Sequence, residues 1–111
     1  MARVSTHVLD IAKGMPAKGV LVDLNFGGKL IESARTNAEG RTDPPLFSRD
    51  RIDPGQYELV FHAGEYFRSE GPLEPAFFED IAIQFQVTDP EGNYHIPLLL
   101  APHGYSTYRG S

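Results

Sequence analysis

Residues 20–35 read VLVDLNFGGKLIESAR, and this stretch decides the fold class. Every even-numbered residue from 20 to 26 is apolar while the residues between them are mixed, which is the period of a β-strand with one buried face. Gly27 and Gly28 follow at once, and a Gly-Gly pair between two strand-like runs is typical of a tight hairpin turn. The stretch therefore predicts a strand, a two-residue turn and an antiparallel strand over residues 29–35.

The same alternation returns along the rest of the chain. Further strand-like runs cover residues 4–11, 57–62, 81–88, 94–100 and the last residues from 105 onward. Turn-forming residues separate these runs at 37–40, 53–55 and 89–93. Residues 63–71 break the alternation and predict one short helix, held by Tyr66 and Phe67. Short strands at this spacing predict an all-β protein, a β-sandwich of seven to eight strands with one short helix.

The composition narrows the class of protein. The chain has 111 residues, of which 41% are hydrophobic and 23% charged, so we expect a single domain over residues 1–111 with a substantial core. Its net charge of -5 argues against a nucleic-acid partner, because the basic surface that phosphates require is missing. Cysteine is absent, which excludes disulfides, thiolate nucleophiles and cysteine-based zinc sites.

The sequence shows neither a membrane-spanning run nor a signal peptide. The longest apolar run, from Ile96 to Ala101, is far shorter than the roughly 20 residues that cross a bilayer. No apolar segment follows Arg3 in the manner of a signal peptide. We therefore expect a cytoplasmic protein with no membrane partner.

Strand parity, the alternation of odd- and even-numbered side chains between the two faces of a strand, places two histidines away from the core. If the even-numbered residues from 94 to 100 face the core, His95, Pro97 and Leu99 face outward. Pro97 within this run indicates an edge strand or an irregular ladder. In the first strand, His7 and Leu9 share the face opposite the valines. Apolar residues on both faces of a strand indicate a second buried surface, most simply a subunit interface.

The chain ends on residues 105–111, YSTYRGS, an aromatic-rich and strand-like run. Parity places Ser106, Tyr108 and Gly110 on one face. A cavity at a subunit interface would bring His7, His95 and Tyr108 together, with Arg41 reaching it from the turn at 37–40. The alternatives stay open: an ordinary last strand, solvated arginines, and histidines that only line a surface or an interface.

Several segments together resemble one family. They are residues 5–10 (STHVLD), 14–17 (GMPA), 36–41 (TNAEGR), 94–100 (YHIPLLL) and 105–111 (YSTYRGS). They are similar to the transthyretin-related proteins, the 5-hydroxyisourate hydrolases, nearly throughout the chain and in the same order. The final Tyr-Arg-Gly-Ser distinguishes these hydrolases from the hormone-carrying transthyretins. Ala101, where the family often has Ser, and residues 44–53 depart from the pattern.

The resemblance implies a transthyretin-like fold, a homotetramer built as a dimer of dimers, and active sites in its central channel. It implies hydrolysis of 5-hydroxyisourate to 2-oxo-4-hydroxy-4-carboxy-5-ureidoimidazoline in urate degradation. Carried over by position, the catalytic residues are His7, Arg41, His95 and Ser111. The substrate-binding residues are His7, Arg41, Tyr108, Arg109 and Gly110.

Opening a cyclic amide needs a water nucleophile, a base and a place for oxyanion charge. With no cysteine and no seryl triad pattern, we expect direct attack by water. Either His7 or His95 can be the base, since imidazole titrates near neutrality. We favour His7, which lies in the more distinctive motif, with His95 orienting the water or protonating the leaving nitrogen. Arg41 would keep a histidine neutral and pair with the oxyanion.

The last four residues, the cofactors and the alternative functions remain to be considered. Tyr108 and Ser111 would hold the substrate ring, and Arg109 would bind substrate or lock the tail through an ion pair. We expect no cofactor and no catalytic metal, since the histidines have no carboxylate partner in the pattern. His62 and His103 are expected at the surface. A transthyretin-like carrier and an immunoglobulin-like structural domain are the rival functions.

Overall fold

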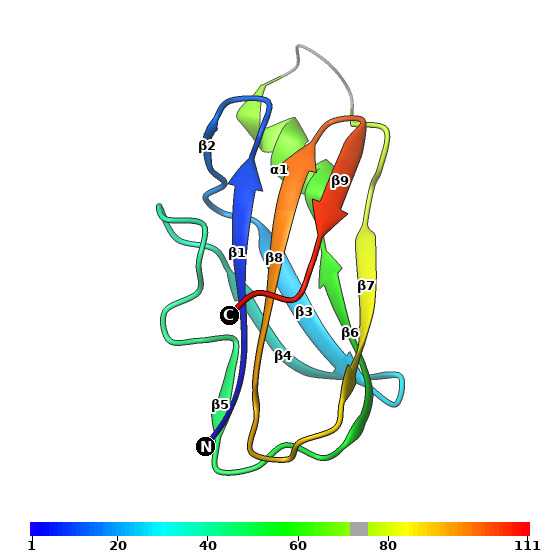
Figure 1. The fold of residues 1–111 in the computed structure, drawn as a ribbon. Coiled ribbons are helices and arrows are strands. Elements are labelled where there is room, and N and C mark those ends of the chain that lie inside the picture. The colour runs from blue at the N-terminus through cyan, green and yellow to red at the C-terminus, as the bar shows by residue number, and fades with distance from the viewer. Residues whose placement is uncertain (72–75) are drawn as a thin grey trace.

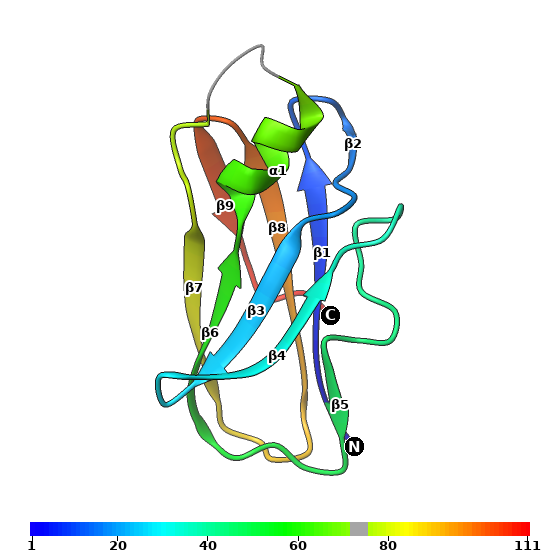
Figure 2. The same ribbon diagram turned by 180° about the vertical axis from the view of Figure 1, so that it is seen from behind.

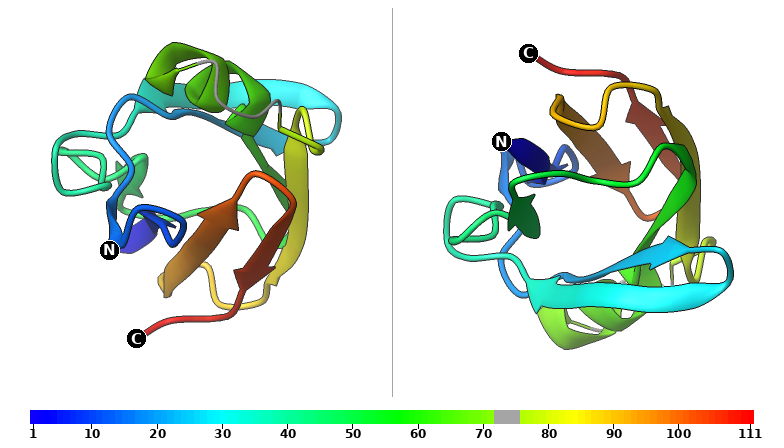
Figure 3. Two further views of the ribbon diagram at one scale, coloured as in Figure 1. Left: turned by 90° about the horizontal axis from the view of Figure 1, so that it is seen from above. Right: turned by 90° about the horizontal axis from the view of Figure 1, so that it is seen from below.

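The computed structural model describes residues 1–71 and 76–111, and its strands form two sheets that pack face to face (Figures 1 and 3). One sheet has the order β2-β1-β8-β9, with β5 also pairing with β1, and the other has the order β4-β3-β6-β7. The elements of the described residues are β1 (Ala2–Asp10), β2 (Met15–Pro16), β3 (Leu21–Phe26), β4 (Lys29–Arg35), β5 (Phe47–Arg49), β6 (Gly55–Phe61), α1 (Ala63–Glu70), β7 (Ile81–Val87), β8 (Asn93–Ala101) and β9 (Gly104–Thr107).

The predicted all-β sandwich with one short helix is confirmed. The β3–β4 hairpin turns at Gly27 and Gly28, whose φ angles of 60° and 78° suit glycine and the tight turn that the pair predicts. The structure adds two elements that the pattern did not predict, β2 and β5. They have two and three residues, too few to display an alternation.

The core lies between the two sheets and is built from the alternating apolar residues. Its fully buried large side chains come from both sheets and include Val8, Leu24, Leu59, Phe61 and Leu98. Burying a side chain of this size contributes about 1.5–3 kcal/mol. The alternation of residues 20–35 therefore sets the fold because it gives β3 one face that must be covered.

Helix α1 covers one end of the sandwich (Figure 2). Tyr66 and Phe67 are buried there, as the sequence predicted. The Tyr66 hydroxyl donates a hydrogen bond of 2.8 Å to the buried Asp10 carboxylate, and the other oxygen of Asp10 accepts from the backbone N–H groups of Ala12 and Lys13. The end of β1 is thereby tied to the helix.

Strands β1 and β8 pair in parallel, which brings residues about 90 positions apart into contact. Ser5 lies opposite His95, and His7 lies opposite Pro97. In both strands the odd-numbered residues lie on the outward face, as parity predicted for the two histidines. His7 and His95 are partly buried there.

Pro97 does not mark an edge strand; of the two alternatives, the structure has the irregular ladder. Strand β8 lies between β1 and β9, but the pairing with β9 stops at Leu98, which lies opposite Thr107. The Pro97 carbonyl accepts a hydrogen bond of 2.6 Å from the Thr107 hydroxyl, so this residue's backbone faces the β9 side just beyond the end of that ladder. A missing N–H costs little at this position.

Candidate active site

The two histidines of interest lie on the outward face of the β1–β8 pair, beside the last residues of the chain. Ser5, directly opposite His95, places its hydroxyl oxygen 2.8 Å from His95 Nδ1. His7 follows two residues later on the same face of β1. This local arrangement depends on the parallel register, because a one-residue shift of either strand would turn that strand's histidine toward the core.

Arg41 reaches this face through a tightly hydrogen-bonded turn. The Asn37 side-chain oxygen accepts from the N–H groups of Glu39 and Arg41 at 2.9 and 3.1 Å, and the Asn37 N–H donates to the Arg41 carbonyl at 2.7 Å. The Gly40 carbonyl then accepts from the N–H of Val8 at 2.8 Å, which fixes the turn against β1. The turn therefore delivers Arg41 to the strand that carries His7.

Gly40 is required for this docking. Its φ is +77°, and a Cβ there would lie 2.3 Å from the Val8 carbonyl oxygen and 3.3 Å from His7 Cδ2. Any side chain would meet the backbone of β1 in a conformation that favours glycine. The close approach of the turn to His7 thus depends on the absence of a side chain.

The electrostatic surroundings of His95 favour its neutral form. Burial, the positive charge of Arg41 and the neighbouring His7 lower the pKa of His95, and a weaker interaction with the Ser5 backbone opposes them. These interactions show that Arg41 and His7 lie close enough to act on the ring. A neutral imidazole is able to accept a proton near pH 7.

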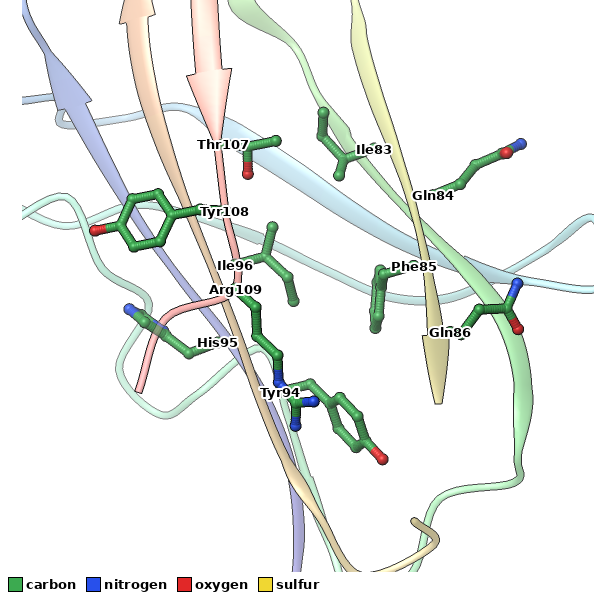
Figure 4. Close-up of a pocket in the computed structure, with 10 residues that line it drawn as sticks. All are labelled: Ile83, Gln84, Phe85, Gln86, Tyr94, His95, Ile96, Thr107, Tyr108 and Arg109. Carbon is green, nitrogen blue, oxygen red and sulfur yellow. The ribbon is translucent and has the colours of Figure 1, made fainter. Parts of the chain in front are cut away.

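The tail of the chain continues along β8 beyond the end of β9. The Gly110 N–H donates to the His95 carbonyl at 2.8 Å. Gly110 lies three positions after Thr107, and His95 lies three positions before Leu98, the partner of Thr107, so this contact continues the β8–β9 register. Tyr108 points to the same side as His95 (Figure 4), as parity predicted. Gly110 lies so close to the ring that a Cβ would come 2.5 Å from His95 Cδ2.

Arg109 points to the other side of the tail. Its guanidinium carbon lies 5.0 Å from the centre of the Tyr94 ring, and its Nη2 donates to the Asn93 carbonyl at 3.3 Å. These partners are a ring and a backbone carbonyl, so the contacts differ from the ion pair that we expected. Ser111 follows Gly110 and is exposed.

A pocket of about 290 Å³ opens beside the tail, between β7, β8 and the last residues (Figure 4). Its lining is mixed, with apolar side chains from both sheets and polar ones at the rim: Ile83, Gln84, Phe85, Gln86, Tyr94, His95, Ile96, Thr107, Tyr108 and Arg109. His95 and Tyr108 line one side of it, so the tail separates this pocket from the outward face that carries His7.

Residues 1–71 and 76–111 hold no group of three or more His, Cys, Asp or Glu side chains arranged to bind a metal ion. None of the helices within this part of the chain is sufficiently long and apolar to cross a membrane. Of the other histidines, His62 lies between two carboxylates, and His103 is exposed.

A sequence profile of the HIUase/Transthyretin family matches residues 4–110. The chain belongs to this family. The 5-hydroxyisourate hydrolase 2 of Rhizobium meliloti is 50% identical to it over 98% of this chain and 96% of that protein. The enzyme named 5-hydroxyisourate hydrolase from Pseudomonas aeruginosa is 43% identical, over 100% of this chain and 93% of its own length.

Solved structures agree with the family assignment. The structure of Klebsiella pneumoniae 5-hydroxyisourate hydrolase superposes with a TM-score of 0.88 at 39% identity and covers 100% of both chains. A transthyretin from Sparus aurata superposes with a TM-score of 0.84 at 26% identity, covering 96% of this chain and 95% of its own. This member of the HIUase/Transthyretin family is thus more similar to this hydrolase than to this transthyretin, in sequence and in structure.

Sequence reasoning missed three residues that build the site of this family member: Ser5, Asn37 and Tyr94. The alternation places Ser5 on the same face as His7 but gives it no role, because its partner His95 follows only from the β1–β8 register. Asn37 was assigned to a turn without its bond to Arg41. Tyr94 was assigned to the core, and its ring also supports Arg109.

Proposed function

We propose that this protein hydrolyses 5-hydroxyisourate to 2-oxo-4-hydroxy-4-carboxy-5-ureidoimidazoline, a step of urate degradation. The observation that carries the proposal is the cluster of His95, His7, Arg41 and the tail on one outward face, in which burial and Arg41 lower the pKa of His95. The 5-hydroxyisourate hydrolases among its relatives are 38–50% identical to it. The family and the cluster together support a hydrolase.

The reaction adds water across a cyclic amide, and His95 is our choice for the base. The sequence motif favoured His7 instead, but His95 is the ring held in place by Ser5 and Gly110, and burial and Arg41 lower its pKa so that it can accept a proton. In the proposed step, His95 takes a proton from water, the oxygen bonds to the amide carbon, and the C–N bond then breaks. The proton passes to the leaving nitrogen.

Arg41 has two roles in this scheme. Its charge lowers the pKa of His95, and its guanidinium pairs with the oxygen that becomes negative when water adds to the carbonyl. His7, close to both, orients the water or donates the proton to the leaving nitrogen. Direct attack by water requires no nucleophile from the protein, in keeping with a chain without cysteine.

The tail contributes to substrate binding. Tyr108 points to the His95 side and Gly110 lies against the His95 ring, so Tyr108, Gly110 and Ser111 form one wall of the proposed site. Arg109 holds this wall in place through Tyr94 and Asn93. Its contribution to substrate binding is therefore indirect in this scheme.

The proposed assembly is a homotetramer, a dimer of dimers, with the site in a channel between subunits. Leu9 and Leu99 lie on the outward face of β1 and β8 and are only partly buried in the single chain. Covering them would also enclose the two histidines. Analytical ultracentrifugation tests this point, since sedimentation as a monomer would contradict it.

The test of the function is the ultraviolet absorbance of 5-hydroxyisourate made freshly by urate oxidase. The purified protein should accelerate its decay well above the spontaneous rate, and the accelerated rate should rise in proportion to protein concentration. A transthyretin-like carrier would leave the decay unchanged or slow it. An unchanged decay would therefore reject the hydrolase.

A further inference from the structure

We propose that Ser5 is a positioning residue for His95: its hydroxyl accepts a hydrogen bond from Nδ1–H and so directs the lone pair of Nε2 toward the substrate. Ser5 and His95 are direct partners in the β1–β8 ladder, and the distance between Ser5 Oγ and His95 Nδ1 is 2.8 Å. This inference rests on the proposed function for its chemistry, although the tautomer itself can be observed without substrate.

The packing around the ring leaves one nitrogen free for catalysis. Nδ1 faces Ser5, and Cδ2, on the other side of Cγ, lies under Gly110, where an added Cβ would approach it to 2.5 Å. The ring is thus held on two edges by β1 and by the tail. Nε2, at the end of the ring away from Cβ, is the nitrogen that can take a proton from water once Nδ1 carries the hydrogen.

The proposed hydrogen bond has a defined direction, from the ring N–H to the hydroxyl oxygen. A serine hydroxyl can donate or accept, and only an accepting hydroxyl leaves Nε2 without a proton. An accepting Ser5 hydroxyl at 2.8 Å therefore favours the Nδ1–H tautomer, in the way that a fixed partner sets the tautomer of many functional histidines.

The structural alternative is that the Ser5–His95 bond only links β1 to β8. That role would be minor, because the two strands already share a ladder of eight paired positions. A purely structural bond would influence stability and leave the tautomer and the chemical step unchanged. A positioning bond should lower kcat with little effect on KM, since the ring would still be present but presented in a mixture of tautomers.

The experiment compares Ser5→Ala, Ser5→Thr and the control Ser33→Ala. Ser33 also hydrogen-bonds through its hydroxyl, to Asp23 at 2.7 Å, but it lies in β4 of the other sheet. Ser5→Ala should lower kcat roughly five- to tenfold, as for one lost hydrogen bond between neutral groups, with KM almost unchanged. Ser5→Thr keeps the hydroxyl and should restore most of kcat, and Ser33→Ala should match the wild type.

Nitrogen-15 NMR of the histidine side chains adds a measurement independent of activity, with His95 assigned by its loss in His95→Asn. The wild type should show Nδ1 protonated and Nε2 unprotonated above the pKa, and Ser5→Ala should show a mixture. A wild-type Nε2–H tautomer, or equal kcat in Ser5→Ala and the wild type, would overturn the proposal. If the wild type fails to hydrolyse 5-hydroxyisourate, the proposed function falls, whereas the spectra still decide the tautomer.

Discussion

His95 in β8 and His62 at the end of β6 are both partly buried, but their neighbours carry opposite charges. His62 places Nε2 2.8 Å from an Asp23 oxygen and Nδ1 3.2 Å from an Asp80 oxygen. The hydrogen bond to Asp23, together with the charges of both aspartates, raises the pKa of His62. Burial and the cation Arg41 lower the pKa of His95.

The two rings are buried to a similar degree, so the opposite shifts of their pKa values come from the charge of their neighbours. A ring with a carboxylate on each nitrogen is stabilised as a cation and links two strands of one sheet to the segment before β7. A ring next to a guanidinium and a hydroxyl is stabilised as a neutral base. From the sequence, the family motifs assigned His95 to the site and left His62 at the surface. The carboxylates of Asp23 and Asp80 beside His62 could not be predicted.

The largest expected effect tests this comparison directly. His95→Asn should lower kcat/KM about 10²- to 10⁴-fold, the usual contribution of a general base. His62→Asn makes the same chemical change on the other sheet and should leave kcat/KM near the wild-type value. Steady-state kinetics on fresh 5-hydroxyisourate measures both, and similar losses in the two variants would remove the distinction.

Arg41→Gln should give the next largest loss, roughly ten- to a hundredfold in kcat/KM, because it removes charge from the oxyanion site. It should also move the acid limb of the pH profile to higher pH, since Arg41 lowers the pKa of His95. In the wild type this limb should lie below the ordinary histidine value of 6.5.

Arg41→Lys is the matched control, because it keeps the charge without the planar guanidinium. Its acid limb should stay close to that of the wild type, although its kcat should fall. An unshifted acid limb in Arg41→Gln would mean that Arg41 does not set the protonation of the base.

Gly110→Ala should have a smaller effect on activity, roughly tenfold, because the new methyl group would collide with His95 and displace the tail. Gly104→Ala is a suitable control, since a Cβ on Gly104, at the start of β9, meets nothing within 4 Å. Both variants should melt within a few degrees of the wild type. Equal activity of the two variants would mean that the tail does not need to lie against the ring.

The smallest effect concerns His62 and stability. Because folding raises its pKa, its contribution to stability is fully present below the ordinary value of 6.5 and is lost as pH rises through the folded-state value. The destabilisation by His62→Gln should therefore be larger at about pH 5.5 than at about pH 8.5. Solvent screening should keep it below about 1 kcal/mol. Urea unfolding measures it, and a greater destabilisation at the higher pH would contradict the assignment.

The fold could be predicted largely from the sequence because alternation is a local signal. The run from residue 20 to residue 35 specifies two strands and their turn without reference to the rest of the chain. The same signal placed His7 and His95 on outward faces. It left an edge strand and an irregular ladder open for Pro97, because the choice between them depends on β9 and on the residue where the β8–β9 pairing stops.

The contacts within the candidate site could not be predicted, since they join segments that are distant in sequence. The bond between Ser5 and His95 depends on a parallel register, and the position of Arg41 depends on Asn37 and on the space that Gly40 leaves beside β1. The contacts of Arg109 follow from the position of the Tyr94 ring beneath the tail. Apart from Asn37, which lies in the predicted turn beside Arg41, none of these partners is implied by spacing along the chain.

The parallel pairing of β1 with β8 also has a consequence for biosynthesis. The chain between them contains the β3–β4 hairpin and all of the other sheet, whose neighbouring strands are closer in sequence and can pair earlier. Loop-closure entropy delays contacts of long sequence separation, so the sheet that carries His7 and His95 should assemble last. On a ribosome, β1 must wait unpaired with β8 until almost the whole chain has emerged. During refolding, catalytic activity should therefore appear later than the β-sheet signal, because the site forms only when this last sheet is complete.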